Sequence, residues 1–167
     1  MNTEYSDSFD YCVNLILKEE GGYVDNKQDP GGKTRFGISQ RQYPYLDIAT
    51  LTEEAAREIY HMDYWTPVRG DDLPKPVALC VFDCAVNQGV GSAIRLLQGT
   101  VGADVDGQLG PQTMLFLKQR PVIDVVNNFM ADRALKYSRT PNYDVFGKGW
   151  TRRLFRIHTH AARIIPA

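Results

Sequence analysis

Residues 16–39 read ILKEEGGYVDNKQDPGGKTRFGIS and change character at Gly21. Before that glycine, apolar residues recur at helical spacing from about Ser6, which predicts a helix that ends at Glu20. Gly21 and Gly22 end this helix, because glycine adopts the left-handed conformation of a helix stop at little cost. The residues that follow are rich in Asp, Asn, Pro and Gly, and they predict loop with a short hairpin of two or three strands.

Glu20 falls in the middle of the apolar stripe of this helix. On a helical wheel at about 100° per residue it lies between Val13 and Ile16, whereas Glu19 lies near the edge of the stripe. Burial disfavours the ionised form of a carboxylate, and a general acid must carry a proton near neutral pH. Two interpretations stay open at this point: a functional acid, or a side chain that caps the helix end into solvent.

A second polar group follows, with Asp25, Asp29 and Thr34 in the hairpin region. A loop that contains Pro30-Gly31-Gly32 can turn back and place one aspartate across a cleft from Glu20. Carboxyl pairs about 6.5–9.5 Å apart serve inverting glycosidases, and pairs about 5–5.5 Å apart serve retaining ones. The alternatives are that both aspartates form turns, or that they hold a hard cation, although their spacing matches no calcium loop.

Helical patterns cover most of the remaining chain. Thr50 and Glu53 fit a capping box for a helix that reaches about Trp65, and this helix should turn Ala55, Ile59 and Met62 inward. The apolar run at 77–88 predicts a central buried helix. We expect further helices at 93–97, 112–119, 121–138 and 148–164. The fold class is therefore mainly α with a small β element, and the glycine-rich stretch 99–111 predicts a boundary between residues 1–98 and 99–167.

Composition excludes several classes of protein. The 167 residues carry a net charge of −1, which argues against a general nucleic-acid binder. No stretch approaches the roughly 18 apolar residues of a membrane span, and the polar N-terminus does not read as a secretory signal. We expect Cys80 and Cys84 to be buried thiols, and neither the cysteines nor the histidines show a metal-ligand spacing. We expect a monomer folded in reducing cytoplasm, without a metal, a cofactor or stable membrane insertion.

The neutral total hides an acidic first half and a basic end. Five cations and no acid stand in the last twenty residues: Lys148, Arg152, Arg153, Arg156 and Arg163. Three interpretations fit this segment. It is a solvated helix face, or Arg153 is tied to the core beside Trp150, or the segment is attracted to an anionic cell wall or lipid surface.

Within residues 16–39 the order of motifs is specific. The elements are Glu20-Gly21-Gly22-Tyr23, Asp29-Pro30-Gly31-Gly32, Thr34 and Gly37-Ile38. This combination resembles the signature of the glycoside hydrolase family 108 N-acetylmuramidases, lysozyme-like enzymes found in phage endolysins and in bacterial genomes. Later positions also resemble the family, among them Asp83, Asn87, Trp150 and Arg153.

The resemblance implies a lysozyme-like, two-lobed fold and cleavage of the β-1,4 bond between N-acetylmuramic acid and N-acetylglucosamine in peptidoglycan, without a cofactor. Glu20 maps to the catalytic glutamate, and Asp29 with Thr34 would hold the attacking water, with Asp25 as the competitor of Asp29. We expect five residues to line the saccharide groove: Tyr23, Asp25, Tyr64, Trp65 and Asn87. Tyr23 and Trp65 are equally compatible with a core position, and Asn87 with a helix cap.

The resemblance also implies that residues 1–98 form the catalytic lobe and residues 99–167 a helical peptidoglycan-binding lobe. A phage or prophage endolysin without a signal would wait in the cytoplasm until it is released to the wall. Two alternatives remain: a lytic transglycosylase, which uses one carboxylate and forms an anhydro-sugar, and a non-catalytic peptidoglycan-binding or scaffold protein on the same fold.

Overall fold

The chain divides into two units, residues 1–63 and 64–167, in the computed structural model, which describes residues 4–20, 24–25 and 33–166. The boundary that we predicted between residues 98 and 99 falls inside the second unit, within helix α4. The functional assignment of residues 1–98 and 99–167 stays a prediction.

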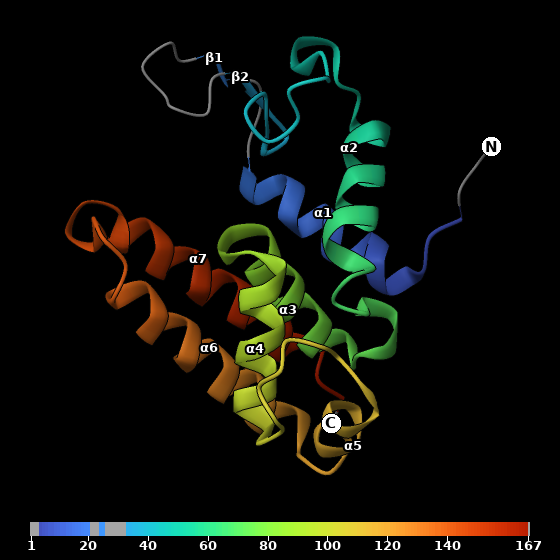
Figure 1. The fold of residues 1–167 in the computed structure, drawn as a ribbon, viewed down its shortest axis with the longest axis vertical. Helices are drawn as coiled ribbons and strands as arrows, with labels where there is room; N and C mark the ends of the chain where they lie inside the picture. Colours follow the sequence, from blue (N-terminus) through green and yellow to red (C-terminus); the bar gives the residue numbers. More distant parts are fainter. Residues whose placement is uncertain (1–3, 21–23, 26–32, 167) are drawn as a thin grey trace. The chain divides into compact units, whose positions relative to one another are not determined.

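The first unit begins with helix α1 (Asp7–Glu20), as the apolar spacing predicted (Figure 1). Its buried residues are Phe9, Cys12, Val13 and Ile16, so the predicted stripe is confirmed. Ser6 stabilises the start of the helix, because its hydroxyl accepts a hydrogen bond of 3.1 Å from the backbone N–H of Phe9.

A small antiparallel sheet follows, with the strand order β1-β2-β3. Its strands are β1 (Val24–Asp25), β2 (Lys33–Arg35) and β3 (Ile38–Ser39). Strands β2 and β3 pair Arg35 with Ile38, so their turn consists of Phe36 and Gly37 alone. Both turn residues have positive φ, 53° and 77°, which is the backbone of a type I′ hairpin turn.

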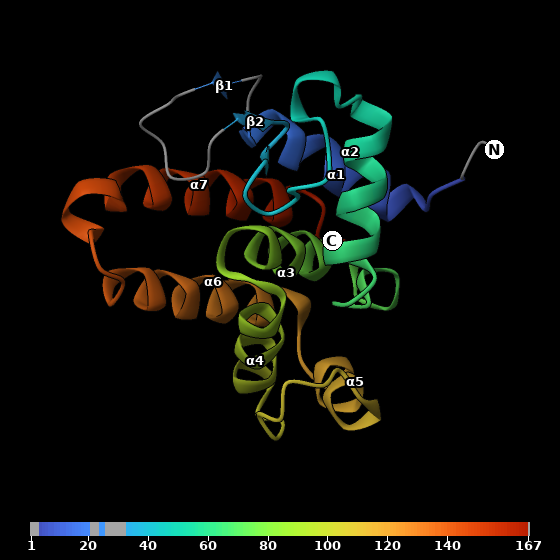
Figure 2. The same ribbon diagram turned by 45° about the horizontal axis from the view of Figure 1, so that its top comes forward.

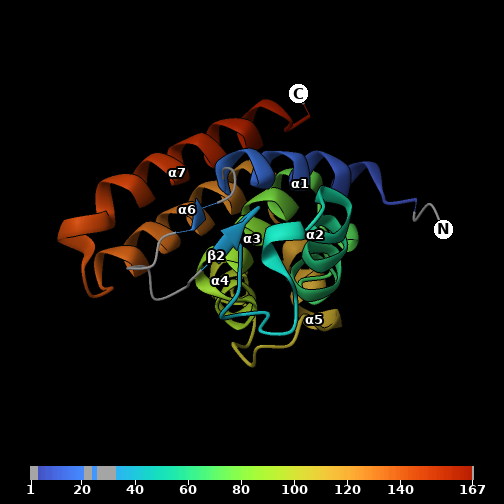
Figure 3. The same ribbon diagram turned by 90° about the horizontal axis from the view of Figure 1, so that it is seen from above.

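Helix α2 (Glu53–Tyr60) packs against α1, as Figures 1 and 3 show from two sides. Arg57 joins the two helices through an ion pair with Asp10 and a hydrogen bond of 2.7 Å to Asn14. A short 3₁₀ turn, η1 (Ile48–Thr50), precedes α2, and a π-helical turn, η2 (His61–Trp65), follows it.

The predicted cap and inward face of α2 are wrong. The capping residue is Thr52 rather than Thr50, because the Thr52 hydroxyl accepts a hydrogen bond of 3.2 Å from Ala55 N. The buried residues are Ala56 and Tyr60, while Met62 is 69% exposed. The predicted face missed the buried one by a single residue, which turns a helix by about 100°.

The second unit is built around helix α3 (Lys75–Gln88), which is buried along most of its length and packs against α4 (Val90–Val101), α6 (Val122–Ser138) and α7 (Tyr143–Arg163). This confirms the predicted central buried helix. Figure 2 shows α6 and α7 side by side as a pair of long helices. The short helix α5 (Pro111–Lys118) has proline in its first turn, where the missing N–H costs nothing.

The glycine-rich stretch 99–111 is tied to α4 by the buried side chain of Gln98. The amide nitrogen of Gln98 donates to the Asp106 carboxylate (2.6 Å) and to the carbonyl of Gln108 (3.0 Å), and its oxygen accepts from Gly107 N (2.8 Å). The hydrogen bonds from Gln98 and from the backbone of Gln108 lower the pKa of Asp106. These bonds explain why the stretch does not separate two lobes.

Asp83 of α3 is a buried charge paired with two arginines. Its carboxylate oxygens lie 2.9 Å from the guanidinium of Arg133 on α6 and 2.9 Å from that of Arg153 on α7. Asp83 and Arg133 are fully buried, and Arg133 also donates to Gln88 (3.0 Å). The predicted tie between Arg153 and the core is therefore present. The cluster connects three helices through one carboxylate.

All three cysteines lie in the described part of the chain and are buried. Burial raises the pKa of the Cys84 thiol to about 11, so this side chain stays protonated near neutral pH. None of the helices among the described residues combines the length and the apolar character that crossing a bilayer requires.

We expect Asp83→Asn to lower the free energy of unfolding by about 3–5 kcal/mol, because removing one partner of a buried ion pair leaves an uncompensated charge. Urea unfolding followed by circular dichroism measures this loss. Asp72→Asn is the matched control, because Asp72 pairs with Arg69 at the surface and such pairs contribute about 0–1 kcal/mol. Equal losses in the two variants would contradict a structural role of the Asp83 cluster.

Candidate active site

Glu20 is the last residue of α1, and its carboxylate lies against the turn between β2 and β3. A Cβ atom added at Gly37 would stand 2.7 Å from Cγ and 2.8 Å from Oε2 of Glu20. The second carboxylate oxygen, Oε1, is shielded from solvent. The space for this side chain therefore exists because residue 37 has no Cβ.

Tyr60 of α2 reaches the same turn from the other side. Its ring is 1% exposed, and its hydroxyl donates a hydrogen bond of 2.7 Å to the carbonyl of Phe36. The hydroxyl oxygen would lie 2.6 Å from a Cβ at Gly37, so it shares the space over Gly37 with Glu20. Sequence reasoning missed Tyr60, although a buried tyrosine hydroxyl usually needs a partner, which was an available signal.

Thr34 lies at the centre of the sheet that carries this turn. Its backbone pairs with Val24 of β1 on one side and with Ser39 of β3 on the other, and its side chain is half-buried. The structure therefore brings Glu20 and Thr34 to one hairpin, with Glu20 at the turn and Thr34 on the strand that leads into it.

Of the three other residues that we predicted in this region, the structure describes the backbone of one. Asp25 belongs to β1, where its backbone pairs with Lys33. Tyr23 and Asp29 lie outside the described residues. The choice between Asp25 and Asp29 as the second carboxylate therefore stays a prediction.

Trp65 is a core residue of the second unit. Its side chain is fully buried and packs edge-on against Phe82, with ring centroids 5.3 Å apart. Gly70 packs against the indole so closely that an added Cβ would clash with it. Of the two interpretations of Trp65, the structure supports the core position, whereas its neighbour Tyr64 is half-buried.

Asn87 is exposed near the end of α3, where its amide donates to the carbonyl of Asp83 (2.8 Å). It lines a hollow of about 280 Å³ together with Trp150, which sequence reasoning had not placed in the groove. The aromatic ring of Trp150 stacks on that of Tyr137, with centroids 4.9 Å apart and planes inclined by 19°.

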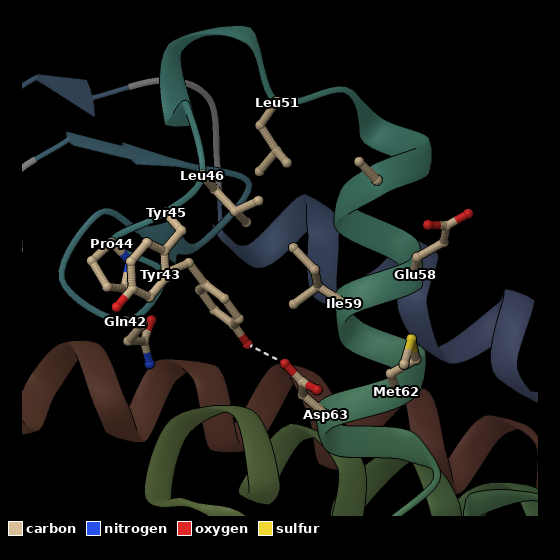
Figure 4. A pocket seen from close by; sticks show the side chains of 11 residues that line it. Gln42, Tyr43, Pro44, Tyr45, Leu46, Leu51, Glu58, Ile59, Met62 and Asp63 are labelled. Carbon is tan, nitrogen blue, oxygen red and sulfur yellow. Dashed lines mark hydrogen bonds between the residues drawn. The ribbon is translucent and has the colours of Figure 1, made fainter.

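A larger pocket of about 550 Å³ lies in the first unit between residues 42–51 and α2 (Figure 4). The hydroxyl of Tyr43 donates to the Asp63 carboxylate (2.7 Å) at one end of it. The remaining lining is mainly apolar, and it includes Leu46 and Ile59 but not Glu20. This pocket offers few polar groups to a hydrophilic ligand.

Among the described residues, the His, Cys, Asp and Glu side chains form no group of three or more that could hold a metal ion. The first unit offers a carboxyl group, Glu20, packed against a tight turn. Such a group can donate a proton to a ligand atom within hydrogen-bond reach.

The chain is similar to a known family and to a solved structure. The profile of the family described as Glycosyl hydrolase 108 matches residues 13–89. A solved structure described as the structure of Brucella abortus SagA is 31% identical in sequence, with a TM-score of 0.87, over 96% of this chain and 97% of that one. A comparison with curated proteins finds no match. The expected fold class, mainly α and lysozyme-like with a small β element, is confirmed.

We expect Gly37→Ala to destabilise the first unit. A positive φ alone costs an alanine about 1–2 kcal/mol, and the added Cβ must also displace Glu20 or Tyr60. Urea unfolding measures the loss. Gly99→Ala is the control, because Gly99 lies in α4 with nothing within 4 Å of an added Cβ, and alanine there should stabilise by about 0.5–1 kcal/mol. A Gly37→Ala protein whose free energy of unfolding rose as that of Gly99→Ala does would contradict the close packing of Glu20 and Tyr60 over Gly37.

Proposed function

The chain belongs to the glycosyl hydrolase 108 family, and from this premise we propose that it is a peptidoglycan hydrolase that cleaves the β-1,4 bond between N-acetylmuramic acid and N-acetylglucosamine. One observation carries the proposal. The Glu20 carboxylate lies over the turn at Gly37, with one oxygen shielded from solvent, inside the segment that the family profile matches.

Glu20 is the general acid of this proposal, and it gives its proton to the glycosidic oxygen that leaves. Proton transfer requires the acid within hydrogen-bond reach of that oxygen, so a fixed carboxylate is favoured over a mobile one. The end of α1 fixes the backbone of Glu20, and the turn at Gly37 together with Tyr60 confines its side chain. Glu19, the neighbouring carboxylate, lies near the edge of the apolar stripe on the helical wheel, and the proposal gives it no role.

Asp29 and Thr34 complete the proposed mechanism by holding a water on the opposite face of the sugar, which inverts the anomeric carbon. Thr34 suits this role because strands on both sides hold its backbone. Asp25 remains the alternative second carboxylate. An inverting enzyme needs about 6.5–9.5 Å between the two carboxyl groups, which leaves room for the water.

The wider assignment is also a proposal. Tyr23, Asp25, Tyr64 and Asn87 contact the glycan, and residues 99–167 contribute a peptidoglycan-binding region. The protein is a phage or prophage endolysin that acts as a monomer and stays in the cytoplasm until it is released to the wall. A lytic transglycosylase is the alternative enzyme, and a non-catalytic wall-binding protein is the alternative without chemistry.

Glu20→Gln should lower the rate of peptidoglycan hydrolysis by about 10²–10⁴-fold, because it removes the transferable proton with almost no change in shape. Release of soluble fragments from dye-labelled sacculi measures this rate. Glu19→Gln is the matched control on the adjacent residue and should keep the rate of the unaltered protein. Full activity in Glu20→Gln would end the proposed role of this residue.

Asp29→Asn and Asp25→Asn identify the second carboxylate, and we expect only Asp29→Asn to approach the loss in Glu20→Gln. The first product should be the α-anomer, as inversion at a β-linked muramic acid requires. Nuclear magnetic resonance of fresh digests detects the anomer, and mass spectrometry detects the muramic acid end. A β-anomer would contradict inversion, and an anhydro end would identify a transglycosylase.

A further inference from the structure

Two hollows adjoin on the second unit at the side chain of Lys136. The first, which we call the Trp150 hollow, is lined by Asn87, Gln88, Lys136, Tyr137, Thr140 and Trp150. The second, the Arg139 hollow, has a volume of about 490 Å³ and is lined by Arg95, Leu96, Gly99, Asp132, Leu135, Lys136 and Arg139. Lys136 is the residue that both hollows share.

The Trp150 hollow combines aromatic surface with fixed amide groups. Trp150 is half-buried and stacks on Tyr137. Gln88 accepts a hydrogen bond from the buried Arg133, and Asn87 donates to the backbone carbonyl of Asp83, so the ion cluster holds one amide and the α3 backbone holds the other. Apolar walls with a few placed polar groups are typical of small-ligand sites, and this mixture suits an N-acetylated sugar.

The Arg139 hollow is positively charged. Arg95, Lys136 and Arg139 face it, and its one carboxylate, Asp132, accepts a hydrogen bond of 3.0 Å from Thr100. Lys136 donates to the hydroxyl of Ser92 (2.6 Å), which is a neutral partner, and the three cations of the hollow outnumber its one carboxylate. Arg95 also lies near Asp106, which makes Lys136 and Arg139 the stronger candidates for an external anion.

We propose that the two hollows form one binding site for peptidoglycan that still carries its peptide stems. A sugar ring lies in the Trp150 hollow, and a stem carboxylate pairs with Lys136 and Arg139 in the adjoining one. This inference rests on the proposed function, because the proposed function names peptidoglycan as the ligand. It adds a preference for stem-bearing over stem-free glycan and assigns that preference to two cations.

The test measures binding of the Glu20→Gln protein to purified sacculi by co-sedimentation, so that the polymer is not digested. Lys136→Gln with Arg139→Gln in this background should weaken binding roughly tenfold, because both cations that pair with the stem carboxylate are then removed. Lys118→Gln removes an exposed cation from α5 of the same unit and should leave binding unchanged. Binding should also weaken with salt less steeply in the double variant.

A second arm compares intact sacculi with sacculi whose stems have been removed by an amidase. The Glu20→Gln protein should bind the stripped polymer more weakly than the intact one, although the amidase leaves a free lactyl carboxylate on each muramic acid. Equal binding to both polymers, or a double variant that binds like Lys118→Gln, would overturn the inference. Arg139→Gln alone keeps the test usable if the double variant does not fold, because Arg139 is exposed after the last residue of α6.

The two proposals fail in different ways. If the unaltered protein releases no fragments but binds intact sacculi in a stem-dependent manner, the proposed hydrolysis is wrong and the binding site stands. If the unaltered protein releases fragments equally from intact and stripped sacculi, and the Glu20→Gln protein binds both equally, the hydrolysis stands and the stem site is wrong.

Discussion

The second unit depends on one buried carboxylate. Asp83 has no access to water, so its charge is tolerable only while Arg133 and Arg153 stay within ion-pair distance. This requirement ties both α6 and α7 to α3 at one point of the core. The ion cluster also has a contact near the surface, because Arg133 donates a hydrogen bond to Gln88. Asn87, the neighbour of Gln88, donates to the backbone carbonyl of Asp83. The buried ion cluster therefore positions Gln88 in an exposed hollow, and the α3 backbone positions Asn87 beside it.

The first unit depends on a different constraint, the absence of a side chain at residue 37. The turn of Phe36 and Gly37 needs positive φ at both residues, and it needs empty space above the glycine. Glu20 and Tyr60 fill that space from two helices. The same glycine that shapes the hairpin thus sets the position of the carboxylate, so fold and candidate chemistry cannot be changed separately there.

The sequence predicted the helices well where periodicity was strong, as in α1 and α3. The wheel placed Glu20 rather than Glu19 in the middle of the apolar stripe, and the catalytic role of Glu20 stays a prediction. It failed where the decision was tertiary. A shift of one residue in α2 buries Tyr60 instead of Ile59, because the Tyr60 hydroxyl finds a partner in the backbone carbonyl of Phe36, 24 residues earlier in the chain. The glycine-rich stretch 99–111 suggested a boundary, since no local pattern shows that Gln98 would bind it back to α4.

The basic character of the chain end illustrates why a count of charges does not by itself predict a partner. Arg153 belongs to the basic segment, yet Asp83 engages its guanidinium inside the unit, and Arg133 is engaged in the same way. These cations cannot also bind an external anion. The cations that remain for one are those at the surface, and Lys136 and Arg139 lie outside the segment that sequence composition had singled out. Where an anionic polymer would bind therefore depends on which charges the core has already neutralised.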